Sequence, residues 1–410
     1  MRFSLLLVAM LLTVSQFSIA QLGWFPIRQD GETILYCIDM YDADNITAVG
    51  SNGTILHSSD GGTSWATPPS GMNDNLRRIR WHSPSLGIIL GLDGTILKSV
   101  DGGTSWQPLS LGSSTPMFDI HFFDEQTWLL VGVGGKSMVT TDGGQTWTSR
   151  TNGINNFNEI SFLGDFGVIV GNKGTIRVTT DGGKNWTDRS AVSNFEMTSV
   201  SVGDDSTAIA VGSNGTILRT QNKGRNWTPI IPSVPISFYR LSRVRHLTRE
   251  RIVLSGYAGL ILWSTDTGLS WYGQESNTSV NIETLEFLDS KIGVAAGWDG
   301  TIIRTNTGGT LDVRRLDTPA PDQSALRDVW PHPLSRQATA HVRMHLAASG
   351  PVTLRVYDLL GRACRTLHAA HTDAGVYTVE WTPSALPSGM YLYRLEQQGR
   401  AYTRTFTLVD

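Results

Sequence analysis

The stretch SSDGGTSW, from Ser58 to Trp65, places an acidic side chain among glycines and hydroxyl residues and ends in a tryptophan. One such stretch could be a cation-binding loop, a catalytic acid on a hairpin, or a turn held together by its own hydrogen bonds. The chain repeats the pattern as SVDGGTSW, TTDGGQTW, TTDGGKNW, TQNKGRNW and STDTGLSW. Because a catalytic acid is needed only once, an acid at the same place in many copies indicates a structural role.

A pair of glycines with the spacing G-x-x-G precedes each copy and sets the period of the repeat. The first glycines of successive pairs lie 41, 41, 39, 41, 44 and 41 residues apart, at Gly50, Gly91, Gly132, Gly171, Gly212, Gly256 and Gly297. The position of the acid is occupied in turn by Asp60, Asp101, Asp142, Asp181, Asn222, Asp266 and Thr307. In every copy, Ser or Thr stands two residues before this position and Gly two residues after it. The chain is therefore an array of similar structural units.

Each unit has the pattern of several short β-strands. The third unit divides into MFDIHFF, TWLLVGVGG, KSMVTTDGG and QTWTSR, which are apolar or alternating runs separated by turn residues. A four-stranded antiparallel unit of about 40 residues cannot bury both of its faces alone and is typical of a β-propeller blade. The sequence therefore predicts an all-β protein with a seven-bladed β-propeller over residues 21–311.

The two ends of the array are expected to meet. The seventh unit has Asp312 where the other units have tryptophan, whereas Trp24 stands 41 residues before Trp65, which is the common period. We therefore predict that the N-terminal segment supplies the outer strand of the last blade. Closing the ring in this way removes open sheet edges, which otherwise promote aggregation.

The repeated acidic box is interpreted as a self-contained turn. Glycines supply positive φ, and the Asp or Asn side chain can accept hydrogen bonds from backbone N–H groups of its own turn, while the tryptophan covers the turn. Calcium binding is the alternative, but a calcium loop normally needs several carboxylates and each copy has one. We therefore predict no metal or cofactor, and we assign a structural role to Asp60, Asp101, Asp142, Asp181, Asn222 and Asp266.

The box S/T-x-D-x-G-x-T/S-W resembles the Asp-box of sialidases, sortilin-like receptors and xyloglucanases. The longer stretch VGSNGTILHSSDGGTSW, residues 49–65, is more similar to the propellers of photosystem II assembly factors, which have relatives among secreted bacterial proteins. The resemblance covers about residues 22–311. It implies a propeller fold but little about function, because this family is mostly non-enzymatic. We predict a protein-binding or assembly scaffold.

The repeat pattern stops near Thr310, and a polar, proline-containing linker is predicted over residues 312–325. Residues 326–410 contain about seven short alternating runs, with Gly361 and Gly389 at the expected turns. This pattern favours a small Ig-like β-sandwich.

Residues 326–410 resemble the C-terminal sorting domain of the type IX secretion system of Bacteroidetes and their relatives. The motifs that carry the resemblance are Pro331 and Pro333, Tyr357-Asp358 with Gly361-Arg362, Gly375 with Trp381, and Leu386 with Ser388-Gly389 and Tyr391. The family usually has Asn between the two prolines, where this chain has His332. The resemblance implies delivery across the outer membrane with the type IX secretion machinery as a partner. An ordinary Ig-like accessory domain is the alternative.

The N-terminus and the composition indicate an exported protein. Arg2 precedes the apolar run FSLLLVAMLL, and Ser18-Ile19-Ala20 fits a signal-peptidase site, so residues 1–20 are predicted to be a signal peptide. No later segment approaches the roughly 20 apolar residues of a membrane helix. The formal net charge of −3 argues against a nucleic-acid partner. We expect a secreted or outer-membrane surface monomer, exported through the periplasm, whose partner is an envelope protein or a glycan.

The spacing of residues assigns no catalytic group. Sialidases of this fold need an arginine triad, and glycosidases need paired carboxylates, neither of which can be recognised here. Metal-ligand spacings, phosphate-binding loops and nucleophile elbows are also missing from the sequence. We therefore predict that the protein is not an enzyme. A secreted glycoside hydrolase or glycan-binding protein is the alternative, suggested by the tryptophans outside the boxes, Trp81, Trp128, Trp263 and Trp298.

The second and sixth units carry arginines at equivalent positions of their first strands. These arginines and one neighbour are Arg78, Arg80, Arg240, Arg243 and Arg245. Since first strands line the axis of a propeller, their side chains could form a basic patch at one end of the channel that binds an acidic partner. The alternative is that they form ion pairs between blades with acids such as Asp39 and Glu286.

Overall fold

The computed structural model describes residues 23–151, 153–190, 193–232, 234–309, 313–316, 323–383 and 386–410. Within these ranges the protein is all-β, and its strands are joined by loops and by single 3-10 turns. None of the helices in the described part is long and apolar enough to cross a membrane. The predicted signal peptide, residues 1–20, lies outside the described residues, as do parts of the predicted linker.

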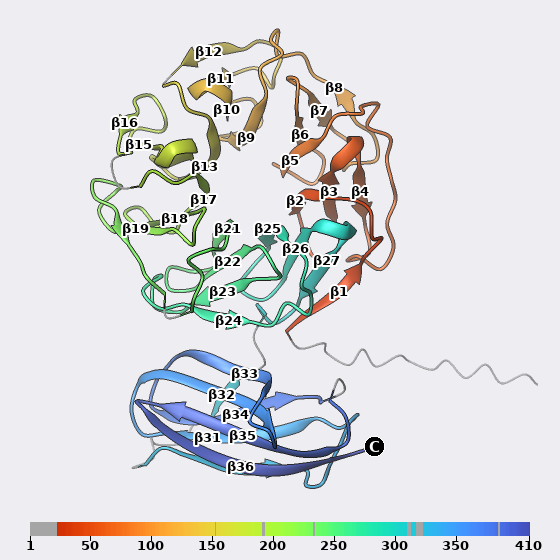
Figure 1. The fold of residues 1–410 in the computed structure, drawn as a ribbon. Coiled ribbons are helices and arrows are strands. Elements are labelled where there is room, and N and C mark those ends of the chain that lie inside the picture. Colours follow the sequence, from red (N-terminus) through yellow and green to blue (C-terminus); the bar gives the residue numbers. More distant parts are fainter. Residues whose placement is uncertain are drawn as a thin grey trace, which may run out of the picture.

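The first three quarters of the described chain form a ring of seven antiparallel sheets, as Figure 1 shows. In order around the ring, the strands are β2 (Leu35–Met40), β3 (Ile46–Gly50) and β4 (Ile55–Ser58); β5 (Leu76–Trp81), β6 (Gly87–Gly91), β7 (Ile96–Ser99) and β8 (Gln107–Pro108); β9 (Met117–Phe122), β10 (Trp128–Gly132), β11 (Lys136–Thr140) and β12 (Thr148–Thr151); β13 (Phe157–Leu163), β14 (Phe166–Gly171), β15 (Ile176–Thr179) and β16 (Thr187–Asp188); β17 (Met197–Val202), β18 (Ala208–Gly212), β19 (Ile217–Thr220) and β20 (Thr228–Pro229); β21 (Leu241–His246), β22 (Ile252–Gly256), β23 (Ile261–Ser264) and β24 (Tyr272–Gln274); and β25 (Ile282–Phe287), β26 (Gly293–Gly297), β27 (Ile302–Thr305) and β1 (Trp24–Arg28). The 3-10 turns are η1 (Ser51–Gly53), η2 (Val133–Gly135), η3 (Asn172–Gly174) and η4 (Trp298–Gly300).

The second strand of each sheet forms the hydrophobic centre of its unit. These strands, such as β6 with the sequence GIILG, are buried along their whole length because neighbouring sheets cover both faces. Each ends at the first glycine of a G-x-x-G pair. At Gly171, a Cβ atom would lie 1.9 Å from the carbonyl oxygen of Asn156, so the close approach of two backbones requires glycine there.

The N-terminal strand completes the sheet of the last repeat. β1 pairs antiparallel with β27, and Trp24 lies opposite Thr305. The amide of Gly23 donates to the hydroxyl of Thr307 at 3.2 Å. Trp24 itself is fully buried. The two ends of the repeat array therefore meet in one sheet, which is the arrangement that the spacing of Trp24 and Trp65 indicated.

The C-terminal residues form two sheets packed around a separate core. One sheet has the order β28 (Val313–Leu316), β34 (Gly375–Trp381), β31 (Ala340–Leu346) and β29 (Ala325–Trp330); the other has the order β30 (Leu334–Ser335), β36 (Arg400–Val409), β35 (Gly389–Gln397), β32 (Gly350–Asp358) and β33 (Ala363–Thr372). Trp381, Tyr393 and Phe406 fill the core between them.

The predicted linker, residues 312–325, contains strand residues in the structure, and its last residue, Ala325, already begins β29. Residues 313–316 within it form β28, which pairs antiparallel with β34 of the C-terminal sandwich. A strand of four residues in a polar, proline-containing stretch carries too little pattern to be recognised from sequence, and it forms here because β34 offers a free edge. The sandwich therefore begins before residue 326.

Candidate functional site

The acidic boxes satisfy their own carboxylates. The carboxylate of Asp60 accepts hydrogen bonds from the hydroxyl of Ser64 at 2.6 Å, the amide of Ser64 at 2.8 Å and the hydroxyl of Ser58 at 2.8 Å. The hydroxyl of Ser58 also accepts a bond from the amide of Gly62. The hydrogen bonds from Ser64 lower the pKa of Asp60 to about 2. The box is therefore a closed turn on the surface, in which the carboxylate is bound by donors of the same turn.

The box positions without a carboxylate keep this geometry in part. The side-chain oxygen of Asn222 accepts bonds from the amide of Asn226 at 2.9 Å and the hydroxyl of Thr220 at 3.1 Å. At Thr307 the side chain instead accepts the amide of Gly23, so the last copy uses its box position to close the ring. Within the described ranges, no group of three or more His, Cys, Asp or Glu side chains could hold a metal ion.

The first strand of each sheet presents two side chains to the central channel, because alternate residues of a strand share a face. By register, the first set is Cys37, Arg78, Asp119, Glu159, Ser199, Arg243 and Thr284. The second set is Asp39, Arg80, His121, Ser161, Ser201, Arg245 and Glu286. Each set contains two arginines and two carboxylates, so the channel lining is balanced in charge.

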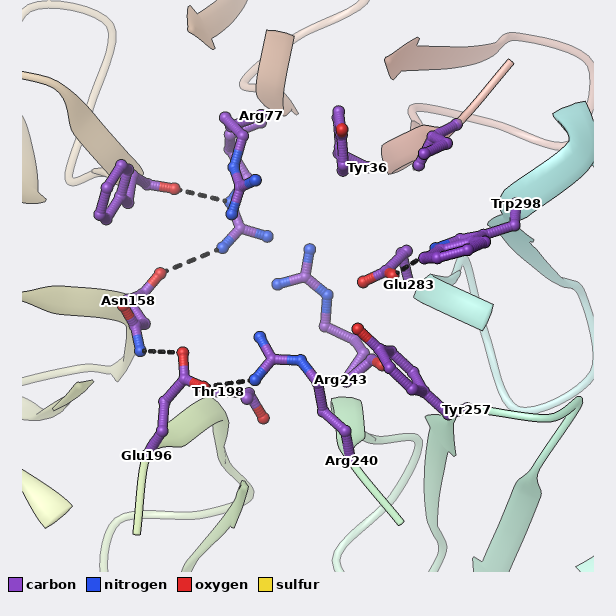
Figure 2. A pocket seen from close by; sticks show the side chains of 14 residues that line it. Tyr36, Arg77, Asn158, Glu196, Thr198, Arg240, Arg243, Tyr257, Glu283 and Trp298 are labelled. Atoms are coloured by element: carbon purple, nitrogen blue, oxygen red, sulfur yellow. Dashed lines mark hydrogen bonds and ion pairs between the residues drawn. The ribbon is translucent and has the colours of Figure 1, made fainter. Parts of the chain in front are cut away.

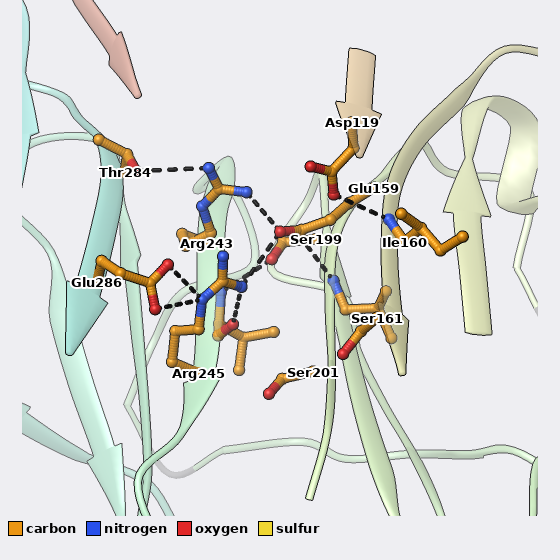
Figure 3. A network of polar contacts seen from close by, with 12 residues as sticks. Asp119, Glu159, Ile160, Ser161, Ser199, Ser201, Arg243, Arg245, Thr284 and Glu286 are labelled. Atoms are coloured by element: carbon orange, nitrogen blue, oxygen red, sulfur yellow. Dashed lines mark hydrogen bonds and ion pairs between the residues drawn. The ribbon is translucent and has the colours of Figure 1, made fainter. Parts of the chain in front are cut away.

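Glu159 is the centre of the channel network (Figure 3). Its carboxylate lies 2.5 Å from a nitrogen of Arg243, 3.1 Å from Arg245, 3.4 Å from Arg80 and 3.9 Å from Arg78. Burial alone would raise the pKa of Glu159, but the guanidinium groups of Arg243 and Arg245 outweigh it and hold the pKa well below its usual range. Glu159 therefore stays ionised in the channel.

Two further carboxylates complete the pairing of the channel arginines. Glu286 lies 2.9 Å from both Arg80 and Arg245, and Asp119 lies 2.9 Å from Arg78. Arg78–Asp119 and Arg245–Glu286 join neighbouring sheets, and Arg80–Glu286 joins sheets that are not neighbours, so these contacts hold the ring together.

The channel acids also bind the next sheet through its backbone. Asp119 accepts the amide of Ile160 at 3.1 Å, and Glu159 accepts the amide of Val200 at 3.1 Å. Asp39 accepts the amide of Trp81 at 2.8 Å. Burial raises the pKa of Asp39 to about 6, in spite of the nearby guanidinium of Arg80. These bonds make the channel side chains structural connectors between sheets.

Four of the five arginines of the predicted basic patch lie in the channel. Arg78, Arg80, Arg243 and Arg245 lie inside the channel in ion pairs between sheets, which is the alternative that the sequence left open. The reason is that each shares the channel with carboxylates from other first strands. Arg240 alone lies at the rim, where it pairs with Glu196.

A pocket of about 470 Å³ opens at the end of the channel where Arg78 and Arg243 form the floor. We call it the mouth pocket, and its walls include Tyr36, Arg77, Glu196, Arg240, Tyr257, Glu283 and Trp298 (Figure 2). The guanidinium of Arg77 lies 5.0 Å from the centre of the Tyr36 ring and, among the described residues, has no ion pair. An Arg held by an aromatic ring and open to the pocket is suited to bind a carboxylate.

An aromatic pair forms the opposite wall of the mouth pocket. Trp298 is 39% exposed, its ring nitrogen donates to Glu283 at 2.8 Å, and its ring centre lies 6.5 Å from that of Tyr257. Ser242 also lines the pocket, and its buried hydroxyl has no hydrogen-bond partner in the described part of the chain. The pocket thus combines aromatic surface with charged groups and an unused donor.

Sequence reasoning missed Arg77 and Tyr257, and it named Trp298 only as one of four tryptophans that suggested a glycan ligand. Tyr257 and Trp298 directly follow the first glycine of a G-x-x-G pair, where the other copies have Ser, Leu, Val, Asn and Ser. A comparison of this one position across the seven copies would have found them, because large aromatic side chains are unusual at an exposed turn.

The other end of the channel has a second cavity of about 300 Å³, with Arg80, His121, Phe162 and Arg245 in its wall. His121 stacks on Phe162 with ring centres 4.6 Å apart, and burial lowers the pKa of His121 to about 4. Its imidazole is therefore neutral near pH 7. Since the two arginines here are already paired with Glu286, this end offers fewer free charged groups than the mouth pocket.

The tryptophans outside the boxes do not form an open aromatic platform. Trp128 and Trp263 are buried, Trp81 is half-buried beside the second cavity, and Trp298 is exposed at the mouth pocket. Trp81 and Trp298 lie at opposite ends of the channel, so the four tryptophan side chains do not meet on one face.

A ring of antiparallel sheets around a central axis defines a β-propeller. In this protein, ion pairs fill the channel along the axis, and the polar and aromatic mouth pocket lies at one end of it. The model of the family described as photosystem II assembly factor YCF48 matches residues 21–100 and 99–234. The chain belongs to this family. No curated protein matches the sequence.

Solved structures show the same fold at low sequence identity. A structure of YCF48 bound to a D1 peptide is 19% identical, has a TM-score of 0.60, and the match covers 70% of this chain and 95% of that one. YCF48 from Cyanidioschyzon merolae is 16% identical with a TM-score of 0.59, covering 69% and 98%. PorZ, a surface component of the type IX secretion system of Porphyromonas gingivalis, is 12% identical with a TM-score of 0.56, covering 92% of this chain and 59% of that one.

Proposed function

We propose that this protein is a non-enzymatic scaffold that binds a protein partner at the mouth pocket. The observation that carries the proposal is the combination of Arg77, free of ion pairs among the described residues, with the exposed ring of Trp298 across the same pocket. Arginine and large aromatic side chains contribute most to binding energy in protein interfaces. A pocket of about 470 Å³ has room for a few side chains of a partner segment.

The partner is proposed to present an extended segment with a carboxylate. The related YCF48 structure with a bound D1 peptide supports peptide binding as the mode. A carboxylate of the segment can bind the guanidinium of Arg77, while an apolar side chain of the segment packs on Trp298 and Tyr257. A glycan ligand is the competing function, and the separation of Trp81 from Trp298 argues against an extended sugar-binding platform.

We further propose that the protein reaches the cell surface through the type IX secretion system, with the C-terminal sandwich as sorting domain. The likeness to PorZ, which extends over 92% of this chain, supports this assignment. The motif residues of the resemblance build turns and core: Asp358 accepts bonds from the amides of Leu360 and Arg362, and Trp381 packs against Tyr393. In a bacterium with this system, the full chain should reach the surface, and a chain ending at Gly309 should stay in the periplasm.

Site-specific crosslinking tests the binding proposal. A photo-reactive residue is placed at Trp298, and a matched one at Phe123, which packs beside the second cavity. We expect a protein adduct from position 298 only, and we expect Arg77→Ala to lower its yield about tenfold, as for an interface hot spot. Equal adducts from both positions would contradict a site at the mouth pocket.

A glycan array with the same protein distinguishes the competing function. The scaffold proposal expects no glycan signal that depends on Trp298. A signal that Trp298→Ala abolishes would replace the protein partner by a carbohydrate ligand at the same pocket.

A further inference from the structure

The C-terminal sandwich contacts the propeller beside the sheet that closes the ring. β33 is the edge strand of the five-stranded sheet and contacts β24, the outermost strand of the sixth sheet of the ring (Figure 1). Leu367 of β33 belongs to the core of the sandwich, whereas Ala370 belongs to the hydrophobic cluster of the propeller that contains Trp24 and Trp263. One strand therefore joins two hydrophobic cores.

A carboxylate of the propeller satisfies the edge of β33. Glu275, which follows β24, accepts the backbone amide of Thr366 at 2.9 Å and pairs with Arg365 at 3.1 Å. Unpaired amides on an edge strand are open to pairing with other chains, so this bond covers a reactive edge. The contact is thus specific as well as apolar.

Asn277 links the sandwich to the closing strand itself. Its side-chain nitrogen donates to the carbonyl oxygen of Trp24, and its side-chain oxygen accepts a bond from Arg365 at 3.5 Å. The ring nitrogen of Trp24 donates to Gln274 at 2.8 Å, in the same segment. We define the clasp as Glu275, Asn277, Arg365 and Thr366.

We propose that the docked sandwich holds the propeller closed, and that it docks only when β1 is in place. If β1 leaves β27, Asn277 loses its bond to Trp24, and the hydrophobic cluster to which Ala370 belongs loses the indole of Trp24. Docking of the sandwich and pairing of β1 with β27 are therefore thermodynamically linked, so a change that stabilises one of them must stabilise the other. Docking of the sandwich therefore reports that the ring has closed, which goes beyond the binding function proposed above and does not rest on it.

Hydrogen exchange on the chain from Gln21 tests the proposal. Arg365→Glu and Glu275→Arg each replace attraction in the clasp by repulsion, and the double variant restores the opposite charges. Each single variant should raise exchange of the β1 amides about tenfold, and the double variant should return it toward the wild-type rate. Arg394→Glu serves as the control, because it breaks the exposed pair with Glu396 on β35, away from the clasp.

The converse variant tests the other direction of the linkage. Trp24→Ala should raise exchange at β33 while the sandwich core around Trp381 keeps its protection. Small-angle scattering verifies that the single charge variants separate the two parts. The proposal is overturned if β1 exchange stays at the wild-type rate after separation, or if all seven sheets of the ring exchange faster by the same factor.

Discussion

The carboxylate of Glu159 lies 2.5 Å from a guanidinium nitrogen of Arg243, although 84 residues separate them in the chain. The pair connects β13 with β21 across the channel, and both side chains are almost completely buried. A buried charge that loses its partner costs far more than an exposed one, because water cannot replace the lost interaction. The channel network is therefore the most sensitive polar part of the ring.

Glu159→Gln should lower the free energy of unfolding by about 3–5 kcal/mol, the usual cost of breaking a buried ion pair. Urea unfolding monitored by tryptophan fluorescence measures it. The matched control is Glu196→Gln, which removes the half-exposed pair with Arg240 and should cost less than about 1 kcal/mol. Similar small losses in both variants would contradict the role given to the channel.

Asp60→Asn should lower the melting temperature less than Asp60→Ala. An amide oxygen can still accept the bonds from Ser58 and Ser64, as the natural Asn222 does in the fifth copy, whereas alanine leaves them unmade. Calorimetry of the two variants measures the difference. An equal loss in both would mean that the negative charge, rather than the hydrogen bonds, stabilises the turn.

Divalent cations should not affect stability. Since hydrogen bonds within the turn already occupy the carboxylate of Asp60 and those of Asp101, Asp142 and Asp181, EDTA should leave the melting temperature unchanged. Calorimetry with EDTA and with millimolar calcium measures this. A higher melting temperature with calcium would restore the calcium-loop interpretation.

His246 should make the protein less stable in mild acid. Burial lowers the pKa of His246 to about 4, despite the opposing charge of Asp204, so the folded state prefers the neutral ring. The stability that neutral His246 contributes is fully present above the pKa of histidine in the unfolded chain, about 6.5, and is lost as the pH falls from there toward 4. His246→Gln should flatten the decline of the melting temperature across this window. Parallel pH profiles for the two proteins would exclude His246 as a cause.

Trp24→Ala should cost about 3–5 kcal/mol of unfolding free energy, as expected for a fully buried aromatic side chain. The same substitution at the 39% exposed Trp298 should cost less than about 1 kcal/mol and affect binding instead. Urea unfolding compares the two. If Trp24→Ala were equally mild, the last sheet would be stable without its N-terminal strand.

The repeat made the fold predictable, because each unit carries the same local signals. The 41-residue spacing of Trp24 and Trp65 was enough to predict the closing strand, since it equals the common period of the units. The channel arginines could not be assigned in the same way, since Arg243 meets Glu159 only when seven first strands converge on one axis. The mouth pocket could not be predicted for the same reason, because Arg77 and Trp298 lie in repeats that are far apart in the sequence.

The balanced channel has a consequence for how the repeats assemble. The outer parts of the units are nearly interchangeable, so a folding chain could pair strands from the wrong copies, which is a common failure of repeat proteins. The channel positions differ from unit to unit, and a unit in the wrong place would bring Arg78 or Arg243 against another guanidinium instead of Asp119 or Glu159. The channel side chains thus distinguish otherwise similar blades and fix the order in which they assemble around the ring.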